Sequence, residues 1–299
     1  MITIAPSSFI WRVRSARAHV ADKAACERCL VTDLARRLAR VGRGYLLPII
    51  ATALLLFAAD PARADEVVAL YQAYWAGMPA GQIRLTLQEN SGTYREEIGI
   101  RSEGLPRVVT RFRGTAVSEG RVTAERPPEP VHYDAVYDLR KSRDKRLAMR
   151  FVSRTGASIA DRGPEDTSKK PPLAEEFRRN VVDPLSALAA IRHGLQRRKT
   201  NFTVPVYDGA RRFDVLVKVL PKPKAADPYL PVELTLRPIA GFKGDASDDG
   251  DPDDAPRPVA LKFTDDARLV PVSMTVSIYY LPLVVELTKW CDTGAVCGW

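Results

Sequence analysis

Apolar and polar side chains alternate at every second position in several segments between residues 66 and 290. The clearest of these segments are 83–88, 214–219, 232–237, 259–263 and 272–278. Because successive side chains of a strand point to opposite faces, this alternation predicts half-buried antiparallel strands. A doubly wound parallel sheet would show continuous apolar runs instead. We therefore predict a mainly β fold, either a strongly curved antiparallel sheet or an open β-barrel, with one inserted α-helix.

A helical segment interrupts the strand pattern after residue 183. Asp183 is a favourable N-cap, Pro184 suits the first helical position, and Gly194 suits the C-terminal cap. Between them the apolar side chains cover most of the circumference of the helix, at Leu185, Leu188, Ala189 and Ile191. A helix of this kind needs to be buried. We expect it to plug the mouth or the concave face of the sheet.

The first 64 residues predict an export signal. A basic run over 36–43 precedes an apolar stretch over 45–59, and Ala62 and Ala64 then form the small-x-small pattern at which a signal peptidase cuts. As a helix the apolar stretch would rise only about 22 Å, less than the roughly 30 Å of a hydrocarbon core. We therefore predict cleavage after Ala64, a periplasmic location and no stable transmembrane anchor. An uncleaved, short membrane anchor is the alternative.

This signal divides the chain into an N-terminal extension with its signal peptide, over 1–64, and a single β-rich domain over 65–299. The whole chain has 45 Lys+Arg and 36 Asp+Glu. Ten of the basic and four of the acidic residues lie in the extension, which leaves 35 basic and 32 acidic residues in the domain. Because the remaining excess of positive charge is small, we expect no nucleic-acid partner.

Cysteine and histidine are scarce, with 4 Cys and 3 His. The β-rich domain retains only Cys291 and Cys297, which we expect to form a small structural disulfide loop in an oxidising compartment, with a redox-active pair as the alternative. The acidic run 244–254 begins like a calcium loop, but Pro256 stands where the bidentate Glu of such a loop is required. We predict a surface loop there, and no metal or cofactor in the protein.

Two polar clusters could carry chemistry. His132 and Asp134 share the polar phase of one strand, and such a pair can act as a general base. No nucleophile elbow or zinc-binding motif accompanies them in the sequence, so a hydrolase is the weakest of the functions we consider. The basic cluster 140–146 predicts a solvated hairpin tip, with a patch for phosphate or lipid head groups as the alternative.

Aromatic side chains supply the remaining candidate site. Tyr71 and Trp75 share one phase of the first strand, and Tyr133 and Tyr137 share the apolar phase of another. They line either a filled core or an apolar ligand cavity inside the curled sheet. A hollow interior predicts a non-enzymatic binder of a lipid or another apolar or amphipathic envelope ligand. A filled interior predicts a structural or interaction protein of the cell envelope, whose protein partner the sequence does not name.

Four stretches resemble one bacterial family: Ala73–Gly81 (AYWAGMPAG), Val182–Leu188 (VDPLSAL), Val204–Phe213 (VPVYDGARRF) and Phe263–Val272 (FTDDARLVPV). This is domain-of-unknown-function family 3108, whose members are exported proteins of Gram-negative bacteria. The resemblance covers about 66–288 and implies an exported β-rich domain without a known activity. No catalytic residue is carried over from it. The acidic insertion 244–254 and the two C-terminal cysteines depart from the usual pattern of the family.

Overall fold

The computed structural model describes residues 65–104, 112–139, 142–168, 171–242, 257–278, 281–292 and 297. The predicted signal peptide with Ala64, the acidic run 244–254 and part of the basic cluster 140–146 lie outside these described residues. The fold and the site below are those of the unit Ala62–Trp299. No helix in the described ranges is long and apolar enough to cross a membrane.

The described strands form one 13-stranded sheet. They are β1 (Asp65–Trp75), β2 (Met78–Asn90), β3 (Thr93–Ser102), β4 (Arg113–Arg121), β5 (Glu129–Leu139), β6 (Ser142–Arg154), β7 (Ala157–Arg162), β8 (Asn201–Tyr207), β9 (Arg212–Val219), β10 (Tyr229–Ala240), β11 (Arg257–Thr264), β12 (Pro271–Ile278) and β13 (Leu281–Asp292). Between β7 and β8 lie a short 3₁₀ helix, η1 (Glu175–Arg178), and the helix α4 (Pro184–Gln196).

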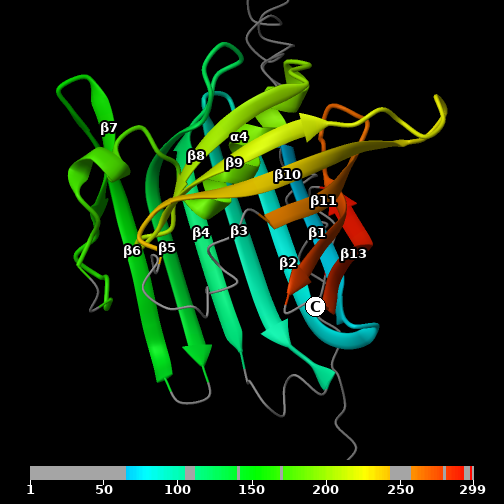
Figure 1. The fold of residues 1–299 in the computed structure, drawn as a ribbon, viewed down its shortest axis with the longest axis horizontal. Helices are drawn as coiled ribbons and strands as arrows, with labels where there is room; N and C mark the ends of the chain where they lie inside the picture. The colour runs from blue at the N-terminus through cyan, green and yellow to red at the C-terminus, as the bar shows by residue number, and fades with distance from the viewer. Residues whose placement is uncertain are drawn as a thin grey trace, which may run out of the picture. The chain divides into compact units, whose positions relative to one another are not determined.

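The sheet consists of two meanders that meet at its centre. Its order is β7-β6-β5-β4-β3-β2-β1-β13-β12-β11-β10-β9-β8. From β1 in the middle, the chain runs outward to β7, crosses to the opposite edge through α4, and returns to the centre, where β13 pairs antiparallel with β1 (Figure 1). All neighbouring strands are antiparallel, as the period of two predicts.

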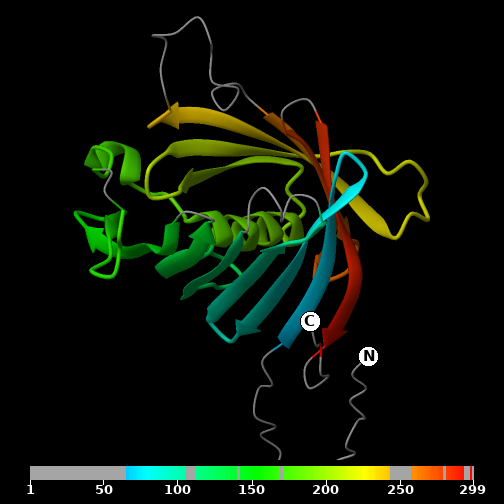
Figure 2. The same ribbon diagram turned by 90° about the horizontal axis from the view of Figure 1, so that it is seen from below.

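The two halves of the sheet curve toward each other around α4 (Figure 2). The helix lies in the concave interior, where its side chains join apolar clusters from both halves of the sheet. A right-handed twist accumulates across a sheet of many strands and makes such curling easier than a flat arrangement. The predicted fold class, a strongly curved antiparallel sheet or open barrel with one inserted helix, is confirmed.

A short segment before α4 joins the two edges of the sheet. The backbone N–H of Asn180 donates to the carbonyl of Ser158 in β7 at 2.7 Å. Two residues later, Val182 donates to the carbonyl of Pro205 in β8 and accepts from the N–H of Tyr207, both at 2.9 Å. Because this segment is hydrogen-bonded to both edge strands, β7 and β8, the sheet is nearly closed into a barrel.

Helix α4 begins as predicted and ends later than predicted. The carboxylate of Asp183 accepts from the backbone N–H groups of Leu185 and Ser186, so Asp183 is the N-cap. The helix continues through Gly194 to Gln196, so the prediction that Gly194 caps its C-terminus is wrong. A Cβ atom at Gly194 would lie 2.5 Å from the ring of Phe202. Gly194 is needed for close packing against β8 rather than for capping.

Candidate functional site

An apolar cavity of about 390 Å³ lies between α4 and the concave face of the sheet. Helix α4 contributes Ala187, Leu188 and Ile191 at its inner face. The other side chains that line the cavity come from nine strands and are mostly aliphatic; they include Tyr71, Ile83, Leu85, Ile98, Val206, Phe213, Val215, Leu234, Leu236, Val259, Leu261, Met274 and Val285. A cavity with this lining suits a ligand, or part of one, that is itself apolar.

The cavity offers few polar groups to a ligand. Its described lining contains no charged side chain, and its hydroxyl groups are those of Tyr71 and Ser273. The Tyr71 hydroxyl already donates to the carbonyl of Pro271 at 2.9 Å. Burial also raises the pKa of Tyr71 above its ordinary value, so the phenol stays neutral. Dispersion and the hydrophobic effect are therefore the forces available for binding inside the cavity.

A buried polar network holds the N-terminal end of α4 against the opposite wall of the sheet. Asp183 accepts from the hydroxyls of Ser186 at 2.5 Å and Ser118 at 2.9 Å. The hydroxyl of Tyr94 on β3 lies 2.6 Å from that of Ser186. Because Ser118 lies on β4, this network connects the helix to β3 and β4. The apolar face of α4 is thereby directed at the cavity.

A single arginine holds the middle of α4. The guanidinium of Arg192 lies 2.7 Å from the carboxylate of Glu89 and 3.4 Å from that of Glu96, and it donates to the carbonyl of Arg268 at 2.9 Å. These contacts tie the helix to the β2–β3 hairpin and to the turn between β11 and β12. Burial raises the pKa of Glu96 to about 8, against the opposing effect of the Arg192 charge.

The predicted aromatic residues occupy different environments. Tyr71 lines the cavity. Trp75 lies further along the same face of β1, half-buried, and its indole N–H is buried without a hydrogen-bond partner among the described residues. Tyr133 packs into the apolar core that β1–β7 share with the start of α4, and Tyr137 is half-buried on the same strand; neither lines the cavity. The alternation with a period of two shows which face of the sheet carries these residues. It does not show which part of that face is packed against other side chains.

Among the described residues, no hydrogen bond joins His132 to Asp134, so the general base considered from the sequence is not formed. Both carboxylate oxygens of Asp134 accept from Arg146, its neighbour on β6, at 2.7 Å each. These two hydrogen bonds pair the carboxylate with the Arg146 guanidinium rather than with His132. His193, on α4, is buried, and burial lowers its pKa, so that its neutral form is favoured.

Cys291 and Cys297 form a disulfide, with their Cα atoms 6.1 Å apart. Both sulfur-bearing residues are buried and pack against Val68 of β1. The side chain of Arg84 on β2 donates to the carbonyl of Cys297 at 2.7 Å. The predicted pairing is therefore confirmed, and the disulfide fastens Cys297 to the outer end of the central strands.

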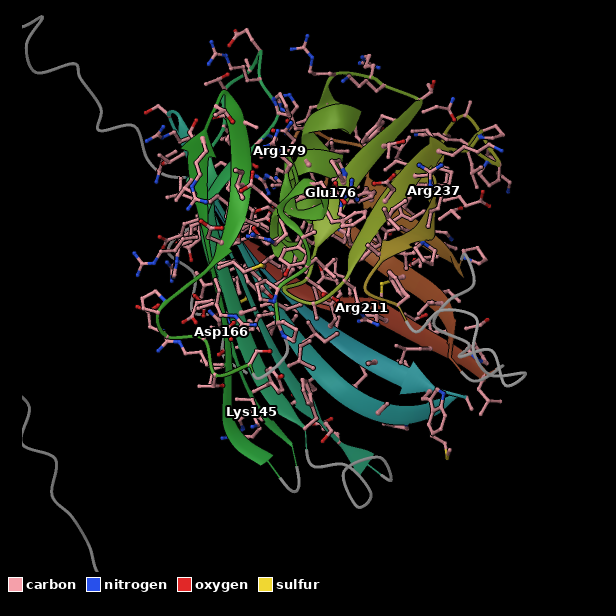
Figure 3. The ribbon with its side chains drawn as sticks, turned by 60° about the vertical axis from the view of Figure 1, so that its left-hand side comes forward. Lys145, Asp166, Glu176, Arg179, Arg211 and Arg237 are labelled. Carbon is pink, nitrogen blue, oxygen red and sulfur yellow. A yellow bond between two sulfur atoms is a disulfide. The ribbon has the colours of Figure 1, made fainter. Side chains whose placement is uncertain are left out.

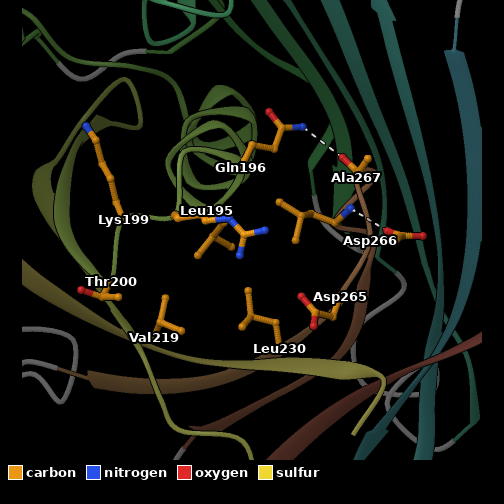
Figure 4. A pocket seen from close by; sticks show the side chains of 11 residues that line it. Leu195, Gln196, Lys199, Thr200, Val219, Leu230, Asp265, Asp266 and Ala267 are labelled. Carbon is orange, nitrogen blue, oxygen red and sulfur yellow. Dashed lines mark hydrogen bonds between the residues drawn. The ribbon is translucent and has the colours of Figure 1, made fainter. Parts of the chain in front are cut away.

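Charged and mixed surfaces lie away from the apolar cavity. Asp214 is held between Arg212 at 2.5 Å and Arg237 at 2.7 Å, and Figure 3 labels Arg237 among the side chains of this half of the sheet. A second pocket of about 670 Å³ lies at the C-terminal end of α4, where Gln196 donates to the carbonyl of Ala267 at 3.2 Å (Figure 4). Lys199 and Asp265 both line this pocket, so its chemistry is mixed rather than apolar.

Most of the residues that line the apolar cavity are not among those predicted from the sequence. The inner face of α4 and the strands β8–β11 supply much of it, whereas the aromatic residues singled out from the sequence supply only Tyr71. The alternating positions of β9, β10 and β11 were the available signal. That signal marks a buried face, and it does not distinguish a cavity wall from a packed core.

The fold and the cavity together define a class of protein: a curled antiparallel sheet that wraps one helix and forms an open apolar cavity beside it. The chain belongs to the family described as "Protein of unknown function (DUF3108)", whose model matches residues 70–226, more than half of the chain. It is similar to a solved structure, a beta-barrel-like protein of the domain of unknown function DUF1849 from Brucella abortus, with 12% identity over 78% of this chain and 99% of that chain and a TM-score of 0.48. A comparison with curated proteins found no match.

Proposed function

We propose that the protein is an exported, non-enzymatic binder that holds the apolar part of an envelope ligand between α4 and the sheet. The observation that carries this proposal is the cavity of about 390 Å³ without a charged side chain in its described lining. Its volume falls within the range of about 300–1,000 Å³ that small-molecule sites occupy. A cavity of this size disfavours the alternative of a structural protein with a filled interior.

Two further observations support export. The basic run, apolar stretch and Ala62-x-Ala64 pattern of the first 64 residues have the order of a cleavable signal peptide. The disulfide between Cys291 and Cys297 is of a kind that persists in oxidising compartments and is rare in the cytosol. Both observations support a periplasmic location.

Native mass spectrometry with organic extraction tests the function directly. The full-length gene is expressed, and the protein is purified from the periplasm in the form that the cell produces. We expect a co-purifying molecule with an acyl chain or a comparable apolar group in near-stoichiometric amount. A protein that carries no such molecule, and takes up none when incubated with extracted envelope lipids, would contradict the proposal. The mass of the same sample also shows whether cleavage occurs after Ala64.

The first prediction concerns a variant that fills the cavity. In Ala187→Phe the new ring would occupy space at the inner face of α4 and displace several ligand methylenes, each worth about 0.8 kcal/mol of burial. We expect ligand occupancy, measured by native mass spectrometry, to fall about tenfold or more.

The control for this prediction is the same substitution three residues further along the helix. Ala190 lines a different pocket, on the side of β6–β8, so Ala190→Phe adds equal volume to α4 without entering the apolar cavity. We expect Ala190→Phe to keep its ligand. An equal loss of ligand in both variants would mean that helix distortion, and not cavity volume, is being measured.

A further inference from the structure

Two long segments of this chain carry no charged residue. Residues 67–83 and 269–285 contain no Asp, Glu, Lys, Arg or His, although 27% of the whole chain is charged. Turns between strands are normally polar because they face water. Each of these segments includes such a turn, between β1 and β2 and between β12 and β13. The absence of charge from both turns therefore calls for a reason beyond core formation.

The fold places these two turns side by side. β1 pairs with β13, so the β1–β2 hairpin lies next to the β12–β13 hairpin, and the N–H of Ala76 donates to the carbonyl of Pro282 at 2.9 Å. Trp75 lies opposite Met78 on one side and opposite Leu283 on the other. Because directly opposed residues of antiparallel strands point to the same face, these three side chains form one apolar row.

The apolar row continues the wall of the cavity. Along β2 the apolar side chains become steadily more exposed, from Leu85 at 5% to Met78 at 42%. Along β13 the same change runs from Val285 at 6% to Leu281 at 42%. Leu85 and Val285 line the cavity. An apolar path therefore leads from the cavity to the exposed ends of the two hairpins; the end of the β1–β2 hairpin is the cyan turn that follows β1 in Figure 1.

We propose that Trp75, Met78, Leu281 and Leu283, here called the tip surface, dock the protein on a lipid bilayer. This inference rests on the proposed function, because an apolar ligand would pass between bilayer and cavity across the tip surface without entering water. A lipid bilayer is the occupant that this chemistry favours. Uncharged apolar segments insert about 5–10 Å into the boundary between head groups and acyl chains, and Trp side chains are enriched at that boundary. Neither turn carries a charged group by which a protein partner could be selected through charge complementarity, and the two tyrosines between β12 and β13, Tyr279 and Tyr280, are of the amphipathic aromatic type that is enriched at membrane interfaces.

The test uses a fluorescent probe of local polarity at a single position. Met78→Cys and, as the matched control, Val136→Cys are labelled in a chain whose Cys26 and Cys29 are replaced by Ser. Val136 is an apolar residue with 37% exposure on β5, which β3 and β4 separate from β2. With vesicles of phosphatidylethanolamine and phosphatidylglycerol we expect a blue shift at position 78 and none at position 136. This contrast is independent of whether the N-terminal apolar stretch is still attached.

A second pair of variants measures the strength of docking. Met78→Gln with Leu281→Gln removes apolar surface without adding charge, and Val131→Gln with Val136→Gln does the same on β5. We expect co-flotation with the same vesicles to weaken about tenfold in the tip variant only, while its ligand content, measured by native mass spectrometry, stays unchanged. Equal flotation of both variants, or no blue shift at position 78, would overturn the proposal and leave a protein partner as the occupant of the tip surface. If native mass spectrometry finds no ligand on the wild-type protein, the proposed function is contradicted instead.

Discussion

Glu96 is a carboxylic acid in a place that water does not reach. Its side chain is fully buried, and its Oε2 atom has no hydrogen-bond partner among the described residues. Burial raises its pKa to about 8, Asp183 and Glu89 push it in the same direction, and Arg192 opposes them. Burying a charge is costly, so the neutral acid is the form that the folded protein favours at neutral pH.

This residue predicts a pH dependence of stability. Between the ordinary pKa of 4.5 and the folded value of about 8, the folded protein keeps a proton that the unfolded chain releases. The free energy of unfolding should therefore fall as the pH rises through this window, by up to about 1.4 kcal/mol per pH unit for this group, and level off above it. Urea unfolding of the wild type and of Glu96→Gln, at several pH values, measures the slope.

We expect Glu96→Gln to have the shallower slope. The slope should not vanish, because burial also raises the pKa of Asp183, which contributes with the same sign. Identical slopes in the two proteins would show that Glu96 is ionised in the folded state and held by Arg192.

At the scale of secondary structure, α4 has an unusual C-terminus. Arg198 adopts a left-handed conformation with φ of 54°, and the N–H groups of Arg198 and Lys199 bond back to Leu195 at 2.8 Å and Gly194 at 3.0 Å. Glycine normally occupies this left-handed position after a helix. The helix instead has its glycine four residues earlier, where the ring of Phe202 needs the space.

We expect the introduction of glycine at position 198 to stabilise the protein and the removal of glycine at position 194 to destabilise it. Arg198→Gly should raise the free energy of unfolding by about 0.5–1 kcal/mol, because the left-handed strain of about 1–2 kcal/mol outweighs the extra entropy of the unfolded chain. Gly194→Ala should lower it, although alanine is intrinsically the better helix former by about 1 kcal/mol. Chemical denaturation of both variants at one pH is the measurement. Stabilisation by Gly194→Ala would mean that Phe202 moves aside freely.

For the domain over residues 62–299, the place where the two edges of the sheet approach has the fewest backbone hydrogen bonds between strands, because only isolated bridges join them there. β7 and β8 stand at opposite ends of the strand order and are joined by the segment 179–182. A central strand such as β1 pairs along most of its length on both sides. Because closure rests on two isolated bridges, we expect local opening here before the sheet unfolds.

Hydrogen exchange tests this expectation. The amide protons of Asn180, Val182 and Tyr207, which bond across the junction, should exchange faster than the bonded amides in the middle of β1. Equal protection at the two places would show that the junction opens only when the whole domain unfolds. Binding of the proposed ligand should slow exchange at α4, because a ligand that binds only the folded form stabilises it.

Several features of this protein follow from sequence alone because they depend on neighbouring residues. The period of two at 83–88 or 232–237 identifies a strand and its buried face, and Asp183-Pro184 identifies the start of a helix. The pairing of Cys291 with Cys297 follows because the β-rich domain holds no other cysteine. The four family-like stretches were sufficient to identify the family.

Tertiary structure alone decided the order of the strands, the near-closure of the sheet and the existence of the cavity. Pairing of β1 with β13 joins residues about two hundred positions apart, and no local pattern encodes that partnership. Tyr71 and Tyr133 have the same periodicity and belong to the same apolar core, yet of the two only Tyr71 also lines the cavity. The physical reason is that periodicity specifies the direction of a side chain, whereas the space in front of it depends on every element that the fold brings to the same place.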